Sequence, residues 1–262
     1  MYTLPDTERV TITETPLSDR VSTFVIEPLS PGYGMTIGHS LRRVILTSLE
    51  GAAVSYVKIS GVDHEFSTLK GMREDVVDLI INLKGMRVRS ESDEPVVMKL
   101  SKKGAGAVTA ADFKDISDIT IADSDHYLAT LDKDGKLEME VTIERGRGYV
   151  TVERKREKQE KLPIGTIAVD SVYTPIKKVH YDVEHTRVGG QTDYDKLTLE
   201  LTTDGTVSPA EAMQHAAKIL VEHFQLIGDA AAQSVTQAQE QPKKKKATTK
   251  KKTATKKTSS KK

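Results

Sequence analysis

The sequence predicts an α+β fold followed by a disordered, lysine-rich C-terminal tail. Three observations lead to this prediction: apolar residues recur at the helical period in some stretches, alternate with polar residues in others, and disappear from the last segment. Alternation of apolar and polar residues gives each strand one solvent-exposed face, which favours antiparallel pairing over a parallel α/β sheet. Helices and antiparallel strands together define an α+β protein.

The first predicted helix covers residues 37–49, with Thr36 as its N-cap and Gly51 just beyond its end. Gly38 lowers the helix propensity of the first turn, which close approach by another backbone would explain. The apolar side chains form one stripe: Ile37, Leu41, Val44, Ile45 and Leu49.

Two adjacent arginines, Arg42 and Arg43, fall off this apolar stripe. The stripe can therefore pack on one surface while the arginines face another. Spacing alone leaves two interpretations open, a solvated helix face and an arginine hot spot in a protein interface.

Two more helices are predicted. One covers residues 73–84. The other begins at Ser208, because Pro209 and Glu211 combine a proline at the first helical position with a capping box. We expect it to end at Gly228. Its stripe contains Met213, Ala216, Ala217, Leu220, Phe224 and Ile227.

Two segments alternate with period two and are predicted strands. Their apolar residues are Leu137, Met139, Val141 and Ile143 in one, and Leu197, Leu199 and Leu201 in the other. Residues 153–161 mix both charges without an apolar stripe, and we expect a solvated loop there.

The net charge of +1 hides a strong asymmetry. Residues 230–262 contain 11 lysines against a single acid, Glu240, so a body of −9 carries a tail of +10. After Pro242 the tail contains only Lys, Thr, Ser and Ala, so no core offsets the entropy of ordering the backbone, about 1–2 kcal/mol per residue, and we expect disorder. Lysines alone can neutralise phosphates without reading a sequence. Nonspecific DNA contacts are predicted at Lys243, Lys244, Lys245, Lys246, Lys250, Lys251 and Lys252.

Several classes of protein are excluded. The chain has no cysteine, so disulfide scaffolds, thiolate zinc sites and cysteine nucleophiles are ruled out. No apolar run approaches the roughly 18–20 residues of a spanning helix, and residues 1–10 do not resemble a signal peptide. We expect a soluble, cytoplasmic chain without a membrane partner.

The search for catalytic and metal-binding motifs predicts neither kind of site. The turn at Gly32 and Gly34 lacks the further glycine and the lysine of nucleotide-binding loops, which favours a structural turn. Thr68 stands where a zinc-protease motif starting at His64 needs its second histidine. His215 and His223 are eight residues apart on a helix, too far to share one ion.

Several long segments occur in the order known from one family. They are residues 24–51 (FVIEPLSPGYGMTIGHSLRRVILTSLEG), 61–86, 108–113 (VTAADF), 145–150 (RGRGYV), 162–188 and 191–212. Over about residues 8–229 the sequence thereby resembles the N-terminal assembly domain of the bacterial DNA-dependent RNA polymerase α subunit.

The resemblance implies two lobes. Residues 1–52 and 170–229 would form a discontinuous dimerisation lobe, an antiparallel sheet with two amphipathic helices. Residues 53–169 would form an inserted, mostly β lobe, and residues 230–262 the tail.

The resemblance also implies a function. The chain would homodimerise and scaffold assembly of the β and β′ subunits for DNA-templated transcription, as a non-catalytic subunit of the enzyme. It would hold no cofactor, since the catalytic magnesium belongs to β′. Further implied partners are the omega subunit, a sigma factor through the holoenzyme, and DNA through the complex and the tail, at the nucleoid.

By resemblance, Arg43 matches the critical arginine of the family, and the β-binding surface comprises Gly32, Gly34, Arg42 and Arg43. Large-subunit contacts map to Asp170, Tyr173, Pro175, Asp193, Asp195 and Lys196. Homodimer contacts map to Ile37, Leu41, Val44, Ile45, Met213, Ala217, Leu220 and Phe224.

Two departures from the family pattern stand out. His39 replaces the usual asparagine, and the lysine tail stands where the family continues into a compact DNA-binding domain. Sequence-specific upstream recognition is therefore not expected. An alternative is a stand-alone nucleic-acid-packaging protein with a histone-like tail, although an acidic body repels DNA.

Overall fold

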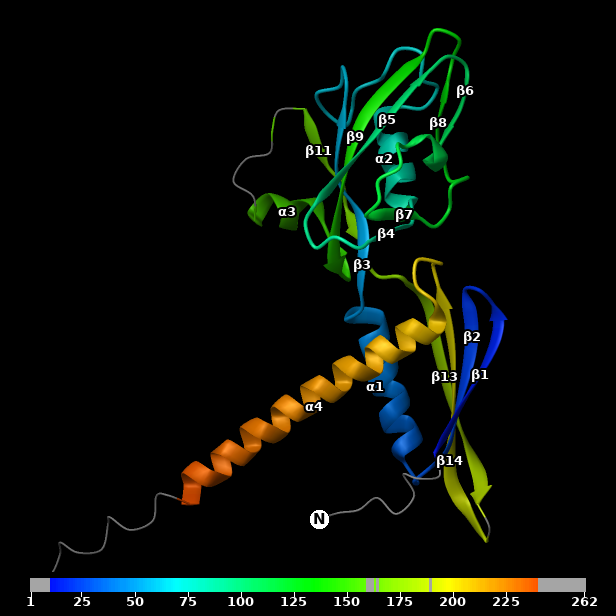
Figure 1. The fold of residues 1–262 in the computed structure, drawn as a ribbon, viewed down its shortest axis with the longest axis vertical. Coiled ribbons are helices and arrows are strands. Elements are labelled where there is room, and N and C mark those ends of the chain that lie inside the picture. Colours follow the sequence, from blue (N-terminus) through cyan, green and yellow to red (C-terminus); the bar gives the residue numbers. More distant parts are fainter. Residues whose placement is uncertain (1–9, 159–162, 164, 189, 240–262) are drawn as a thin grey trace, which may run out of the picture. The chain divides into compact units, whose positions relative to one another are not determined.

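The computed structural model describes residues 10–158, 163, 165–188 and 190–239 (Figure 1). The chain divides into one unit that ends at Leu220 and a second that begins at Val221, within helix α4 (Pro209–Gln239). All the strand pairs in the described residues are antiparallel, and helices are few. The predicted α+β class is confirmed.

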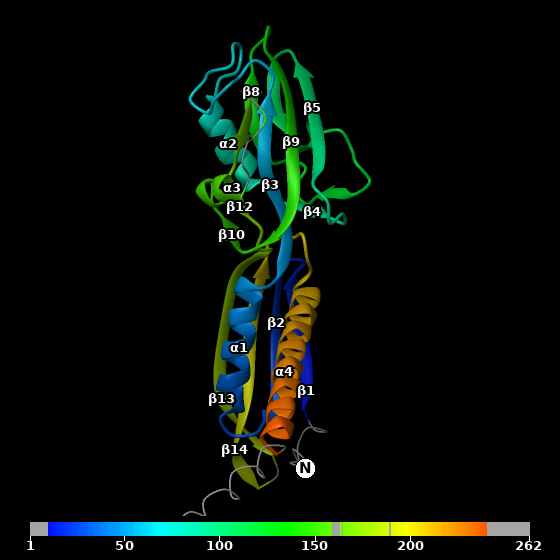
Figure 2. The ribbon, with the colours of Figure 1, turned by 90° about the vertical axis from the view of Figure 1, so that its left-hand side faces the viewer.

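One sheet has four strands in the order β1-β2-β14-β13. Figure 2 shows α1 (Tyr33–Thr47) and the start of α4 on the same face of it. A hydrophobic core fills this layer, built from α1, the sheet and the first turns of α4. The strands are β1 (Thr11–Ser18), β2 (Val21–Leu29), β13 (Ile176–Val188) and β14 (Gln191–Thr203).

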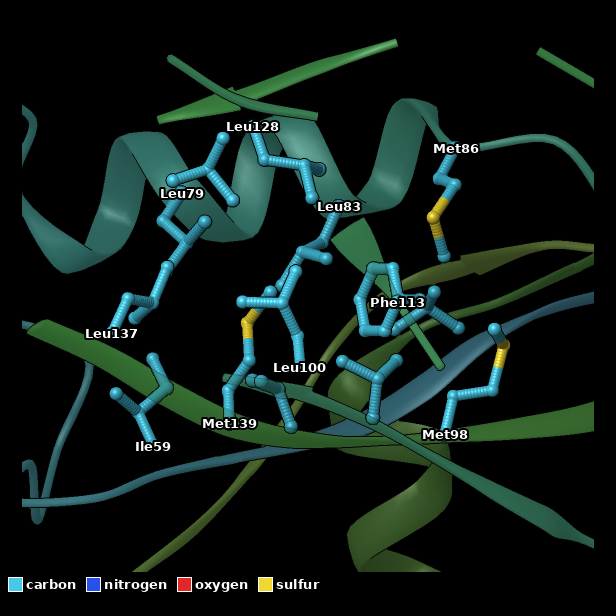
Figure 3. Close-up of a cluster of buried hydrophobic side chains, with 14 of the residues drawn as sticks. Ile59, Leu79, Leu83, Met86, Met98, Leu100, Phe113, Leu128, Leu137 and Met139 are labelled. Carbon is cyan, nitrogen blue, oxygen red and sulfur yellow. The ribbon is translucent and has the colours of Figure 1, made fainter. Parts of the chain in front are cut away.

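A second core belongs to the middle of the chain. Its main sheet has the order β5-β9-β3-β4-β7, and β11 (Thr166–Ala168) also pairs with β3. Leu79 and Leu83 of α2 (Val76–Gly85) point toward Leu100 and Met139 (Figure 3). The strands are β3 (Glu50–Ile59), β4 (Val88–Ser90), β5 (Val96–Lys103), β7 (Ile119–Ile121) and β9 (Lys136–Arg147).

Smaller elements complete this part. Two-stranded sheets join β6 (Gly106–Thr109) to β8 (Tyr127–Leu131), and β10 (Tyr149–Val150) to β12 (Ser171–Val172). A 3₁₀ turn, η2, covers Ala110–Asp112, and helix α3 covers Val152–Lys158.

The predicted strands and the start of α4 are confirmed. Every second residue of β9 from Leu137 to Ile143 is buried, and so is every second residue of β14 from Leu197 to Leu201. At Ser208, the backbone N–H donates to Glu211 Oε2 (3.1 Å), and the N–H of Glu211 donates to Ser208 Oγ (3.3 Å). This reciprocal pair is the predicted capping box.

The predicted ends of the first helix were wrong. The N-cap is Gly32 with φ +82°, a left-handed conformation that favours glycine, and Thr36 lies inside the first turn, where its hydroxyl donates to the Gly32 carbonyl (3.2 Å). At the other end Ser48 is the C-cap, and Gly51 belongs to β3. A side chain at position 51 would collide with the Tyr173 carbonyl oxygen, so packing explains that glycine.

The proposed reason for Gly38 was also wrong in its detail. Side chains, not a backbone, approach it: an added Cβ would lie 2.7 Å from Tyr181 Cδ2 and 2.8 Å from Leu197 Cδ1. Glycine at this position lets α1 lie directly on β13 and β14.

We therefore expect Gly38→Ala to destabilise the protein. Overpacking costs about 1–3 kcal/mol, and the gain in helix propensity, about 1 kcal/mol, offsets only part of this. Urea unfolding measures the effect. Gly228→Ala is the matched control, because an added Cβ there meets nothing within 4 Å, and it should not destabilise. Equal stability of both variants would contradict this account of the packing.

Further sequence predictions were wrong. Gly228 does not end α4, which continues to Gln239, because one glycine costs only about 1 kcal/mol and the alanines after it are strong helix formers. Residues 230–239, which we predicted to be disordered, are therefore helical. Residues 152–158 form α3 instead of a solvated loop, with Thr151 Oγ1 accepting from the N–H of Arg154 (3.4 Å). The helix near residue 80 begins at Val76, after the N-cap Asp75, instead of at Arg73. Residues 240–262, including the seven predicted DNA-contact lysines, lie outside the described residues.

No helix in the part of the chain that the structure describes is both long and apolar enough to cross a membrane.

Candidate functional site

The turn before α1 and strand β14 form one surface. The N–H of Gly34 donates to Asp195 Oδ2 (3.0 Å), and a Cβ at position 34 would lie 2.8 Å from Val183 Cγ1. Asp195 is only 4% exposed, and His185 Nδ1 lies 3.7 Å from its Oδ1. Two segments that the sequence suggested separately, at Gly32–Gly34 and near Asp195, are thus brought together.

Helix α1 presents different residues to its two sides. Leu41 and Ile45 are buried in the core, whereas Arg42 and Arg43 are exposed. The separation agrees with the predicted stripe. No hydrogen bond or ion pair of either guanidinium is seen among the described residues.

Sequence reasoning missed two exposed apolar residues at the start of α1. Tyr33 is 43% exposed and Met35 is 58% exposed, and the Tyr181 hydroxyl donates to Met35 Sδ (3.4 Å). Both precede Thr36, the predicted N-cap, so they fell outside the predicted helix. A prediction that started the helix at Tyr33 would have included them on its surface. They add apolar area beside the turn.

The other residues predicted on β14 have different surroundings. Asp193 is exposed, while Lys196 is partly buried and its Nζ lies 3.2 Å from Glu184 Oε2 of β13. Asp195, being buried, supports the turn through Gly34 instead of offering its carboxylate to solvent.

The predicted contact residues near β12 are also of two kinds. Tyr173, 4% exposed, donates to or accepts from Ser55 Oγ (2.9 Å), and Pro175 is buried. Asp170 is partly exposed and accepts from Lys84 Nζ (3.1 Å), the Tyr149 hydroxyl (2.9 Å) and the N–H of Val152 (2.9 Å). Burial acts to raise the pKa of Asp170, but these hydrogen bonds outweigh it and hold that pKa below its ordinary value.

A buried lysine lies behind this segment and was missed. Lys155 of α3 is 6% exposed and donates to the carbonyls of Val169 (2.6 Å) and Ser55 (3.2 Å) and to Ser171 Oγ (2.5 Å). Burial lowers the pKa of Lys155 to about 8, against the opposing effect of nearby carboxylates. The local run of mixed charges gives no signal that distinguishes Lys155 from its exposed neighbours.

The predicted dimer residues range from buried to exposed. Leu41 and Ile45 belong to the chain's own core, Ile37, Val44, Met213 and Leu220 are partly buried against it, and Ala217 is exposed. In the second unit, Phe224 is 64% exposed. Other large apolar side chains exposed there, which the sequence reasoning did not assign to the interface, are Val221, Leu226 and Ile227.

Within the described residues, no three His, Cys, Asp or Glu side chains are arranged to hold a metal ion. His64, considered above, lies 3.1 Å through Nδ1 from Ser67 Oγ. The prediction that this chain carries no cofactor stays a prediction.

Residues 57–174 match the family model described as the RNA polymerase Rpb3/RpoA insert domain. The chain is 51% identical over 207 residues to the DNA-directed RNA polymerase subunit alpha of Herpetosiphon aurantiacus, covering 79% of this chain and 61% of that protein. It is 54% identical over 203 residues to the subunit of the same name from Symbiobacterium thermophilum, covering 78% and 64%. The similarity thus spans less than two thirds of the length of these relatives.

Proposed function

Because the chain belongs to the family of DNA-directed RNA polymerase α subunits, we propose that it homodimerises and scaffolds the assembly of the β and β′ subunits for transcription. The observation that most supports this is the two-sided α1 helix, with a buried stripe and exposed arginines beside a turn that is bonded to β14. Such an exposed arginine can pair bidentately with a partner carboxylate.

We propose that the two hydrophobic cores belong to two lobes. One core draws on residues before 50 and after 175, and the other on residues 54–169. The matched insert-domain model, residues 57–174, supports an insertion at about the same place. The boundaries at residues 52 and 169 stay predictions.

The dimer contact is proposed to include the exposed apolar residues of α4. Phe224 and Ile227 are three residues apart on the helix and both 64% exposed, as expected for side chains that a partner covers. A second copy presents the same residues, so a two-fold interface can bury both sets. Leu41 and Ile45 then act indirectly, by holding α1 on the sheet.

The remaining roles follow from the same proposal. The chain contributes no catalytic residue, and the catalytic magnesium belongs to β′. Omega, a sigma factor and DNA are partners through the assembled enzyme, which places the chain in the cytoplasm at the nucleoid.

Purification of the native chain from its own cells tests this function. Two large polymerase subunits should co-purify with it and remain after nuclease treatment. A stand-alone nucleic-acid-packaging protein would instead retrieve DNA or RNA and lose its partners with nuclease, and that result would refute the assembly role.

Deleting residues 242–262 should leave dimerisation and assembly intact while weakening DNA binding. The deleted lysines would neutralise phosphates, so the dependence of the binding constant on salt should become less steep. Fluorescence anisotropy with a DNA duplex over a salt series measures this. Glutamine at the seven lysines between 243 and 252, in the full-length chain, separates charge from length. Unchanged binding at low salt, or loss of assembly, would contradict the proposed role of the tail.

A further inference from the structure

The segment from Val169 to Pro175 alternates between two sides. Val169, Ser171, Tyr173 and Pro175 are buried, whereas Asp170, Val172 and Thr174 are partly exposed. Val172 pairs with Tyr149 across β10 and β12, and Tyr149 is 50% exposed. The outer side therefore consists of Asp170, Val172, Thr174 and Tyr149.

Lys155 fixes the inner side of this segment. An ammonium group has three protons, and each is donated: to the Val169 carbonyl, to Ser171 Oγ and to the Ser55 carbonyl of β3. Ser171 Oγ in turn donates to the Val54 carbonyl (2.6 Å), and Lys155 Nζ lies 5.3 Å from the centre of the Tyr56 ring. One buried side chain thus joins α3, β3 and the segment that contains β12.

Burying a charged group costs free energy, and the three hydrogen bonds of the Lys155 ammonium group offset part of this cost. The hydrogen bonds of Lys155 also fix the register of the segment, that is, which of its side chains face inward. A shift of one residue would turn Asp170 and Val172 inward and Ser171 and Tyr173 outward, since strand side chains alternate.

We propose that Lys155 is a positioning residue for large-subunit binding, which holds residues 169–175 in the register that presents Asp170, Val172 and Thr174, with Tyr149, to the partner. The inference rests on the proposed function. It gives Tyr173 and Pro175, two of the contacts implied by resemblance, a supporting role behind the surface.

Loss of the Lys155 proton should therefore weaken binding. The groups facing its ammonium are Glu144 of β9, Asp170, Tyr56 of β3 and Tyr173. As pH rises through about 8, the pKa of Lys155, the amine keeps two protons and one acceptor loses its donor. Asp170, with its lowered pKa, stays ionised over this range, and Tyr56, with a pKa raised by burial, stays neutral.

Binding of the full-length chain to purified β and β′ subunits, measured at pH 7 and pH 9, tests the proposal. Lys155→Met should weaken binding at pH 7 by about tenfold or more, as for other large interface effects. Lys155→Arg keeps a permanent charge and should bind at pH 7 within a few-fold of wild type. Arg156→Met removes an exposed cation from the same helix and should change nothing.

The pH profile separates positioning from simple loss of structure. The affinity of the wild type should fall between pH 7 and pH 9 more than that of Lys155→Arg. The difference between the two pH profiles removes any effect of titration in the large subunits, because both proteins share it. If Lys155→Met fails to fold, this difference decides the question. Equal pH profiles for wild type and Lys155→Arg, or wild-type affinity in a folded Lys155→Met, overturn the inference alone. Failure of the wild type to bind either large subunit overturns the proposed function and the inference with it.

Discussion

Replacing Arg43 with alanine is expected to leave a folded dimer that no longer binds the β subunit. The side chain is exposed, and the buried residues of α1, Leu41 and Ile45, are untouched by the change. Arginines at the centre of interfaces contribute about 2–4 kcal/mol, which corresponds to a loss of roughly 30- to 1000-fold in affinity. Sedimentation reports the dimer, and a binding titration with purified β reports the affinity.

The control for Arg43→Ala is Lys177→Ala, which removes an exposed cation from β13 and should have little effect. Arg42→Ala tests whether the neighbouring guanidinium contributes as well. Dissociation of the Arg43→Ala dimer would show that the two sides of α1 are not independent. Unchanged β affinity would remove Arg43 from the proposed interface.

Phe224→Glu should abolish the dimer. The phenyl ring is 64% exposed in the single chain, and burial of a phenylalanine contributes about 1.5–3 kcal/mol. Glutamate loses this contribution and adds the cost of desolvating a carboxylate, and two-fold symmetry applies both losses twice. We expect the dissociation constant to rise by more than about a hundredfold, measured by sedimentation equilibrium.

Gln225→Glu introduces the same charge one residue further along α4, about 100° away around the helix, and should leave the dimer intact. A circular dichroism spectrum verifies that both variants keep their helix. Persistence of the Phe224→Glu dimer at nanomolar concentration would exclude this part of α4 from the interface.

The sequence predicted those elements whose signal is local. Alternation in β9 and β14 predicted their buried faces, and the triplet of Ser208, Pro209 and Glu211 predicted the start of α4, because each pattern lies within one short window. A short window of sequence did not predict the start of α1. Its cap is a left-handed glycine without any side-chain hydrogen bond, and Thr36 offered a more familiar but unused signal.

The candidate site was predictable only in part, since burial depends on residues far apart in the chain. Arg43 could be placed on an exposed side from its spacing to Leu41. Lys155 could not be found, because its acceptors lie on β3 and near β12, and the run around it mixes charges of both signs. Asp195 was implied as a contact by resemblance, whereas the structure buries it beneath Gly34.

The hydrogen bond between Gly34 and Asp195 has a consequence for variation in this protein. Its donor is a backbone amide, which every residue except proline supplies. A Cβ at position 34 would nevertheless lie 3.0 Å from Asp195 Cβ and 3.1 Å from Asp195 Oδ2, so substitution at either end disturbs the bond. The bond therefore depends on two positions, because residue 34 must leave space for Asp195 and residue 195 must supply an oxygen at the right distance. Asparagine at position 195 keeps an oxygen at the same distance from its backbone as aspartate. Alanine has no side-chain oxygen, and glutamate places its oxygens one methylene group further away. A genetic screen for assembly defects should thus recover changes at residue 195, although it is only 4% exposed, and also changes at residue 34, which lies 161 residues earlier.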